Sequence, residues 1–92
     1  MIYESEKTTC REAVIEYCNI AQKNNTRANL TGANLKGVDL KGANLTRVDL
    51  TRVDLTGANL KGVDLTGANL TRVDLTGVDL TDADLTGCLF YF

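Results

Sequence analysis

Leucine recurs at every fifth position from Leu30 to Leu85, and alanine or valine stands two residues before each leucine. This period fits neither ordinary secondary-structure element. On an α-helix, five residues rotate a side chain by about 500°, so the leucines would spread over every face. On a straight strand, an odd spacing sends alternate leucines to opposite faces. The leucines can share one side only if the chain bends once in each five-residue unit.

Twelve consecutive units cover residues 28–87. Within each unit, Ala or Val and the following Leu lie two residues apart, so both face inward while the intervening Asn or Asp faces outward. The last two residues form a corner, and Gly fills the final position in eight of the twelve units, which suits a turn with positive φ. Other residues hold the remaining corners, where we expect a turn without that demand: Arg47, Arg52, Arg72 and Asp82.

Four corners of roughly 90° close a square coil of 20 residues, and successive coils stack at about 4.8 Å, the spacing of neighbouring strands. The predicted fold class is therefore an all-β solenoid, a quadrilateral β-helix of about three to four coils with a short N-terminal helical cap. The leucines fill its bore: Leu30, Leu35, Leu40, Leu45, Leu50, Leu55, Leu60, Leu65, Leu70, Leu75, Leu80 and Leu85.

The 20-residue register also predicts which outward residues are neighbours. The Asn/Asp columns contain Asn29–Asp49–Asn69, Asn34–Asp54–Asp74, Asp39–Asn59–Asp79 and Asn44–Asp64–Asp84. Asn between two carboxylates relieves their repulsion and adds amide hydrogen bonds. We interpret the columns as ladders that satisfy turn amides, with an acidic recognition surface as the alternative.

The repeated A/V-D/N-L-x-x pattern resembles the pentapeptide repeat family. That resemblance implies a right-handed quadrilateral β-helix with the Leu and Ala/Val positions turned inward. Most members of the family look like binding or scaffold modules. A subset resembles DNA in shape and charge and acts on type II topoisomerases.

The N-terminal segment, residues 1–27, differs from the repeat region, residues 28–92. A capping box from Thr9 to Glu12 and an apolar stripe predict a capping helix at about 9–23. The stripe contains Cys10, Ala13, Val14, Tyr17, Cys18, Ile20 and Ala21, and Val14, Tyr17, Cys18 and Ala21 are the expected cap contacts.

Ile15 does not fit this stripe, but it does fit the five-residue register. An alternative therefore starts the solenoid at residue 13 or 18, which would turn Lys23 and Asn25 into the bore. We prefer the helix because that burial of polar groups is costly.

The last five residues, 88–92, continue the register. Cys88 takes the Ala/Val place, Phe90 takes the Leu place and plugs the bore, and Leu89, Tyr91 and Phe92 face outward. Large apolar residues at a chain end are costly to expose to water. We therefore expect a homodimer that forms through Leu89, Phe90, Tyr91 and Phe92, with folding back over the last coil, or a longer solenoid, as alternatives.

Composition argues against an enzyme. The chain contains no His, which removes the commonest general base and metal ligand, and its three cysteines form no CxxC pair. We expect no catalytic residue, no cofactor and no metal. Because no signal peptide or membrane-spanning segment is recognisable, we expect a cytoplasmic location with reduced thiols and no membrane association.

The expected function is that of a non-enzymatic structural or protein-interaction module with an unknown protein partner. The alternative is a DNA mimic that modulates a type II topoisomerase such as gyrase. The chain holds 10 Lys and Arg against 12 Asp and Glu, so its net charge of −2 is too small for that mimicry. The same near-balance argues against binding nucleic acid. We expect Arg52 and Arg72 to be solvated, with an anion bound between them as the alternative.

Overall fold

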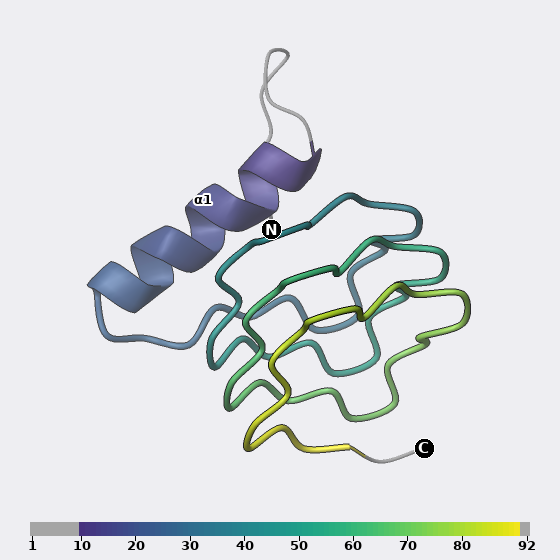
Figure 1. The fold of residues 1–92 in the computed structure, drawn as a ribbon. Helices are drawn as coiled ribbons and strands as arrows, with labels where there is room; N and C mark the ends of the chain where they lie inside the picture. The colour runs from purple at the N-terminus through teal and green to yellow at the C-terminus, as the bar shows by residue number, and fades with distance from the viewer. Residues whose placement is uncertain (1–9, 91–92) are drawn as a thin grey trace.

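A helix precedes the coils, as the apolar stripe predicts. In this computed structural model, which describes residues 10–90, α1 spans Cys10–Lys23 (Figure 1). Thr9, the first residue of the expected capping box, lies outside the described residues. Lys23 and Asn25 are exposed at the end of α1, so the alternative that buries them in the bore is wrong.

Asn25 ends α1 in a left-handed conformation, with φ of 57°. The backbone N–H of Thr26 donates to the carbonyl of Ala21 at 2.8 Å, and that of Asn25 donates to Gln22 at 3.1 Å. These two bonds form a Schellman motif, which satisfies the last carbonyls of a helix and turns the chain away from its axis. The chain is thereby directed into the first coil at Ala28.

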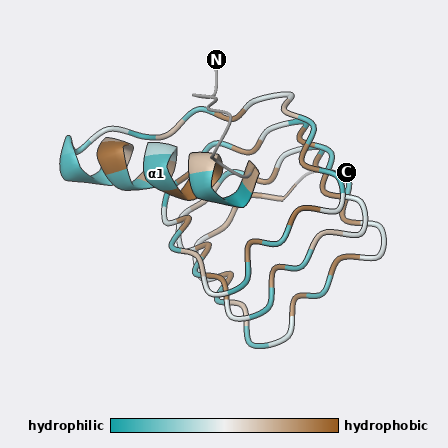
Figure 2. Cartoon of the chain, turned by 90° about the horizontal axis from the view of Figure 1, so that it is seen from above, coloured by the Kyte–Doolittle hydropathy of each residue, from teal (hydrophilic) through white to brown (hydrophobic). Residues whose placement is uncertain are grey.

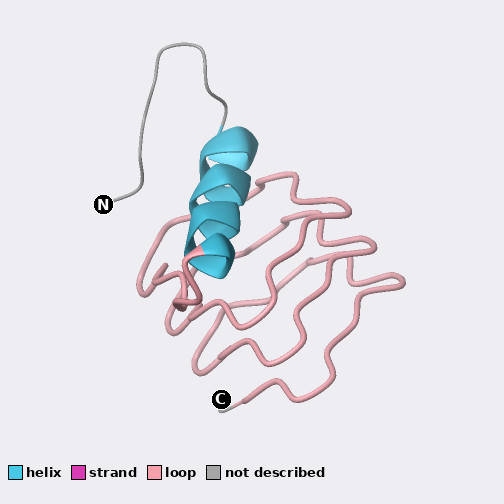
Figure 3. Cartoon of the chain, turned by 90° about the vertical axis from the view of Figure 1, so that its left-hand side faces the viewer, coloured by secondary structure: helices cyan, strands magenta, loops and turns pink. Residues whose placement is uncertain are grey.

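From Ala28 onward the chain returns beneath itself every 20 residues (Figure 1). Parallel bridges join the Asn/Asp positions of successive coils, and the predicted columns are confirmed: Asn29↔Asp49↔Asn69, Asn34↔Asp54↔Asp74, Asp39↔Asn59↔Asp79 and Asn44↔Asp64↔Asp84. Within residues 10–90 these contacts remain isolated bridges and do not extend into strands, so residues 24–90 are drawn as loop in Figure 3. Two inward residues between corners are too few for a longer ladder.

Each corner is a tight turn. The N–H that opens a unit donates to the leucine carbonyl three residues earlier, as from Val53 to Leu50 at 3.0 Å. The third residue of the turn has positive φ at every corner, the pattern of a type II turn. Our expectation for the corners without glycine is wrong, because they adopt the same conformation: φ is 66° at Arg47, 61° at Arg52, 57° at Arg72 and 60° at Asp82. The neighbouring coils dictate the turn, whatever side chain stands there.

The inward positions form a continuous apolar core, visible as brown segments at a regular interval in Figure 2. The leucines from Leu30 to Leu70 are at most 2 % exposed. Leu75, Leu80 and Leu85 in the last coil are only partly buried, because no further coil covers them within residues 10–90. The bore is therefore tightly closed in its upper and middle coils and open at its far end.

Helix α1 contributes Val14, Cys18 and Ala21 to the same core. Tyr17 and Ile15 pack against its margin, whereas Ile20 is 50 % exposed and Cys10 is exposed. The stripe expected from the sequence is thus wrong at Ile15, Ile20 and Cys10. At 100° per residue, Ile20 lies about 120° around the helix from Val14, beyond the contact face. Cys10 stands at the free end of α1.

Candidate interaction surface

The outward Asn and Asp side chains are bound within their own corners. In every unit, the side-chain oxygen of this residue accepts a hydrogen bond from the backbone N–H two residues later, as Asp54 does from Thr56 at 2.9 Å. Where threonine follows, its hydroxyl usually donates to the same oxygen, at 2.5 Å in the case of Thr56. These Asx turns fix the corners and leave the carboxylates committed to the fold.

The threonine bonds also lower the pKa values of six aspartates. Hydroxyl donation from Thr56, followed by its backbone N–H, lowers the pKa of Asp54 below its usual range. In the other five cases, the threonine two residues later donates through its hydroxyl and its backbone N–H in the same way. The residues are Asp49, Asp64, Asp74, Asp79 and Asp84. Since each carboxylate is stabilised in its charged form, none is suited to act as a general acid near neutral pH.

We expect the protein to lose stability in acid. A lowered carboxyl pKa contributes stability above its unfolded value, near 4, and this contribution disappears as the pH falls through the folded value. The melting temperature should therefore be nearly constant above about pH 5 and fall below about pH 4. Thr56→Ala should raise the pKa of Asp54, measured by carboxyl NMR titration. Thr71→Ala, whose hydroxyl donates to the uncharged Asn69, is the control, and an unchanged Asp54 titration in the Thr56 variant would contradict the assignment.

The upper edge of the first coil is covered by donors from α1. In lower coils, the Asn/Asp carbonyl accepts an N–H from the coil above, as Asp49 does from Leu30 at 2.9 Å. In the first coil, the Arg11 guanidinium replaces that donor for the carbonyls of Asp39 and Lys41, both at 3.0 Å. A single arginine thus reaches two positions of the edge.

Two further side chains of α1 complete these contacts. The Tyr17 hydroxyl accepts from the N–H of Asn29 at 3.2 Å and lies 3.4 Å from its carbonyl oxygen. The Gln22 amide donates to the carbonyl of Asn44 at 3.2 Å. Apolar spacing alone does not mark Arg11 and Gln22, so neither was predicted to contact the first coil. The signal that could have found them is the row of unpaired carbonyls at the start of any solenoid.

The opposite edge is not covered within residues 10–90. In higher coils, the N–H of each leucine and the N–H of the third turn residue donate to carbonyls of the coil below. In the last coil, these N–H groups have no acceptor within residues 10–90. The uncovered groups belong to Leu75, Leu80 and Leu85 and to Gly77, Asp82 and Gly87. An edge of this kind can pair with another chain.

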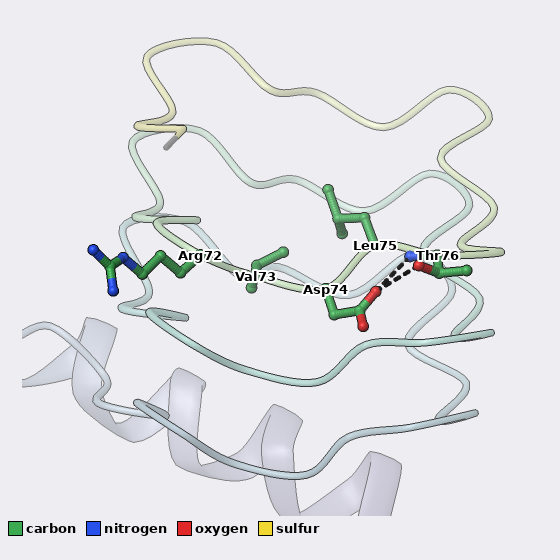
Figure 4. Close-up of a pocket in the computed structure, with 5 residues that line it drawn as sticks. All are labelled: Arg72, Val73, Asp74, Leu75 and Thr76. Atoms are coloured by element: carbon green, nitrogen blue, oxygen red, sulfur yellow. Dashed lines mark hydrogen bonds between the residues drawn. The ribbon is translucent and has the colours of Figure 1, made fainter. Parts of the chain in front are cut away.

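A shallow hollow of about 660 Å³ lies on this edge and is lined by Arg72, Val73, Asp74, Leu75 and Thr76. Figure 4 shows Leu75 pointing into the coil while Asp74 turns outward to Thr76. Apart from that local bond pair, the hollow brings no reactive groups together. It is the open mouth of the bore beside one corner, and its chemistry is that of an apolar surface with a polar rim.

Two of the expected self-association residues, Leu89 and Phe90, lie at this end. Leu89 bridges Asn69 in the outward column and is 54 % exposed, and Phe90 follows at the leucine position with 38 % exposed. Phe90 therefore covers the bore less completely than a plug would. Tyr91 and Phe92 lie outside the described residues.

The thiols and carboxylates form no recognisable reactive centre. Cys10, Cys18 and Cys88 are free, and no group of three Cys, Asp or Glu residues within residues 10–90 is arranged to hold a metal ion. Burial raises the pKa of the Cys18 thiol to about 11. Burial also raises the pKa of the Cys88 thiol, which lies 2.9 Å from the carbonyl of Leu65. A raised pKa lowers the thiolate fraction and with it the reactivity. No helix in the described part of the chain has the length and apolar character needed to cross a bilayer.

Comparison with known families gives a match to pentapeptide repeats, in eight copies, over residues 9–47 and 49–87. The first match runs through α1, although residues 10–23 are helical and not coiled. Helical residues such as Ile15 and Ile20 keep the five-residue spacing, which explains the extension. A search of curated proteins finds no match.

Two solved structures support the same assignment. A pentapeptide repeat protein from the cyanobacterium Cyanothece 51142 has 37% sequence identity and a TM-score of 0.65, covering 73% of this chain and 44% of its own. A pentapeptide repeat protein from the Arabidopsis thaliana thylakoid lumen has 33% identity and a TM-score of 0.65, covering 66% of this chain and 42% of its own. The chain thus spans less than half the length of either protein.

Proposed function

We propose that this chain, which belongs to the pentapeptide repeat family, is a non-enzymatic protein-interaction module that pairs with a second copy of itself. The observation that carries the proposal is the difference between the two ends of the coil stack. Side chains of α1 bind the first edge, whereas the last edge keeps unpaired N–H groups beside exposed apolar side chains. The last edge is the part of the described surface best suited to another polypeptide.

We further infer the finer architecture. A right-handed quadrilateral β-helix of three to four coils agrees with the 20-residue bridge spacing and with four turns in each return of the chain. An N-terminal cap role for α1 agrees with the burial of Val14 and Cys18, both 0% exposed, and with the donors from Arg11 and Gln22. A capped first coil leaves only the other end open for assembly.

Pairing about a twofold axis would place two last coils against each other. Leu75, Leu80 and Leu85 would then be covered, and Leu89 and Phe90 would leave water. Each exposed apolar side chain removed from water favours the pair, at about 25 cal/mol per Å² of apolar surface. The unpaired edge N–H groups would also face the carbonyls of Val73, Val78 and Ala83 of the other copy, which accept no backbone N–H within residues 10–90. A second copy therefore satisfies both the apolar and the polar requirements of this end.

We expect light scattering to give twice the single-chain mass at high micromolar concentration. The triple variant Leu89→Ser, Tyr91→Ser and Phe92→Ser should give the mass of one chain, because it removes the apolar groups that the five-residue register predicts to face outward and keeps the bore leucines. Ile20→Ser is the matched control, since Ile20 is exposed to a similar extent, 50%, on α1. This control should remain paired.

A wild-type monomer at high micromolar concentration would refute pairing through the last coil, and so would dissociation by the Ile20 variant with no effect of the triple variant. Circular dichroism of each variant checks that the fold is retained.

No observation in the described residues favours the DNA-mimic alternative. Six aspartates hold their charge through corner hydrogen bonds, but Lys and Arg at other corners leave the whole chain at only −2. A cytoplasmic location remains a prediction, and a structural relative comes from the thylakoid lumen.

A further inference from the structure

Arginine and lysine occupy different corners of the coil stack. We define the arginine-bounded side as residues 28–32, 48–52 and 68–72, which the bridges Asn29↔Asp49 and Asp49↔Asn69 place one above another. Arg47 stands at the corner before this side, and Arg52 and Arg72 stand at the corner after it. The lysines of the repeat, Lys36, Lys41 and Lys61, lie at the other two corners.

Arg27 adds a fourth guanidinium to the same side. Its Nη1 lies 3.4 Å from the carbonyl oxygen of Gly67, which belongs to the corner of Arg47 two coils below Arg27. The Arg47 side chain extends over the same glycine, with Cγ about 3.4 Å from where a Cβ on Gly67 would stand. Arg27 and Arg47 therefore run together along one border of the side.

These guanidinium groups are exposed, and Arg27 also binds the Gly67 carbonyl and helps to lower the pKa of Asp49. Arg27, Arg47, Arg52 and Arg72 are all exposed, and none forms an ion pair among the residues that the structure describes. Asp49 is the one acidic residue within the arginine-bounded side, and Thr51 binds its Oδ1 through both N–H and hydroxyl. Within the defined residues, Arg52 and Arg72 against Asp49 give a net charge of +1, and Arg27 and Arg47 add two positive charges at the border.

Three of the four corners that hold a left-handed residue other than glycine border this side. Arg47, Arg52 and Arg72 hold left-handed φ values at a turn position that glycine fills in eight of the twelve units. A left-handed conformation is unfavourable for a residue with a Cβ, and Asp82, at a corner away from this side, shares it. All three strained arginines border the same side. Arg52 and Arg72 also stand one coil apart, where two like charges repel unless an anion lies beside them.

We propose that the arginine-bounded side binds an acidic segment of a partner protein, with carboxylates lying against the guanidinium groups on its two borders. The proposal rests on the function of a protein-interaction module and names the chemistry of its partner. Arginine suits this role better than lysine, because its planar guanidinium binds a carboxylate through two parallel hydrogen bonds. Between the borders, outward Asn29, Asn69 and the threonines present short polar groups that let an extended segment approach.

A short acidic segment fits this surface better than nucleic acid. The side that follows the arginine-bounded side along the chain contains Asp54 above Asp74. The side that precedes the arginine-bounded side contains Asp64 above Asp84. A long polyanion would extend over these carboxylates and be repelled, while a segment confined to the arginine-bounded side would not.

Fluorescence anisotropy with the full chain and a labelled octaglutamate peptide tests the proposal. The variant Arg47→Gly, Arg52→Gly and Arg72→Gly is compared with Lys36→Thr, Lys41→Thr and Lys61→Thr. Both variants lose three positive charges, and both introduce residues that the other repeat units use at the same positions. We expect the arginine variant to bind at least about tenfold more weakly than wild type, and the lysine variant to stay within about threefold, because exposed pairs each contribute modestly.

Equal weakening of peptide binding by both variants would overturn the proposal. It would mean that binding depends on the net charge of the chain and not on the arginine-bounded side. Absence of wild-type binding at millimolar peptide would overturn it too, as would tighter binding of a length-matched oligothymidylate. Light scattering on the same samples separates this outcome from the pairing of last coils. Loss of peptide binding with pairing intact refutes only the acidic partner, and the reverse result refutes only the pairing.

Discussion

Replacing Leu60 by alanine is expected to lower the free energy of unfolding by about 3 kcal/mol. Leu60 is 0% exposed and lies in the middle coil, between Leu40 above and Leu80 below in the same column. Truncation removes apolar contacts on all sides, and the coils above and below hold the cavity open. In a chain of 92 residues, this loss is a large part of the total stability.

Leu80→Ala is the matched control, because Leu80 occupies the same column but is only partly buried in the last coil. We expect its loss to be about 1 kcal/mol, because neighbouring atoms are missing on one side already. Urea unfolding at low micromolar concentration measures both values while keeping self-association small. Equal losses for the two variants would mean that the last coil is as well covered in solution as the middle coil.

Placing glycine at all four strained corners is expected to stabilise the protein by about 2–4 kcal/mol. The left-handed conformation costs an ordinary residue about 1–2 kcal/mol. Replacement by glycine removes this cost but loses about 0.5–1 kcal/mol of the gain, because glycine has a larger entropy in the unfolded chain. A net gain of about 0.5–1 kcal/mol remains for each site. The sites are Arg47, Arg52, Arg72 and Asp82.

Thermal unfolding of the quadruple variant measures this gain. The opposite change, Gly57→Ala, tests the same physics, because a Cβ there meets no atom within 4 Å and φ is +69°. Its loss of about 1 kcal/mol would come from the backbone alone. Lower stability of the quadruple variant would indicate that the arginine side chains contribute more to the fold than their lack of ion pairs suggests. A stabilised arginine-to-glycine variant that no longer binds acidic peptide would also show that the loss of binding is not a loss of fold.

The register of the coils could be predicted from the sequence because a single requirement determines it. Leucines five residues apart can share one side only if the chain bends at every unit, and four bends return it to its start. The pairing of Asn29 with Asp49 then follows from arithmetic, and the bridges confirm it. The boundaries of α1 were also within reach, since Asn25 can adopt the left-handed conformation that ends a helix.

Other features depend on contacts that no local pattern specifies. Arg52 shares the glycine-type turn because the coils on either side fix the position of its backbone, and the local preference of arginine is overruled. Ile20 is exposed because the contact face of α1 is centred on Val14 and Cys18. The guanidinium of Arg11 reaches the first edge because unpaired carbonyls there need a donor. The arginine-bounded side appears only once the 20-residue register has been folded into space.

Four five-residue units make one 20-residue coil, and this ratio has a consequence for how such a chain can change during evolution. Gain of 20 residues lengthens the stack and loss of 20 residues shortens it. In both cases every later residue stays in its old column. Gain or loss of five residues keeps every leucine inside but turns everything after it by a quarter of a turn. A five-residue insertion between Arg52 and Arg72 would therefore move the Arg72 guanidinium to another corner, without disturbing the core. A single small duplication could thus redistribute surface charge while the interior remains the same.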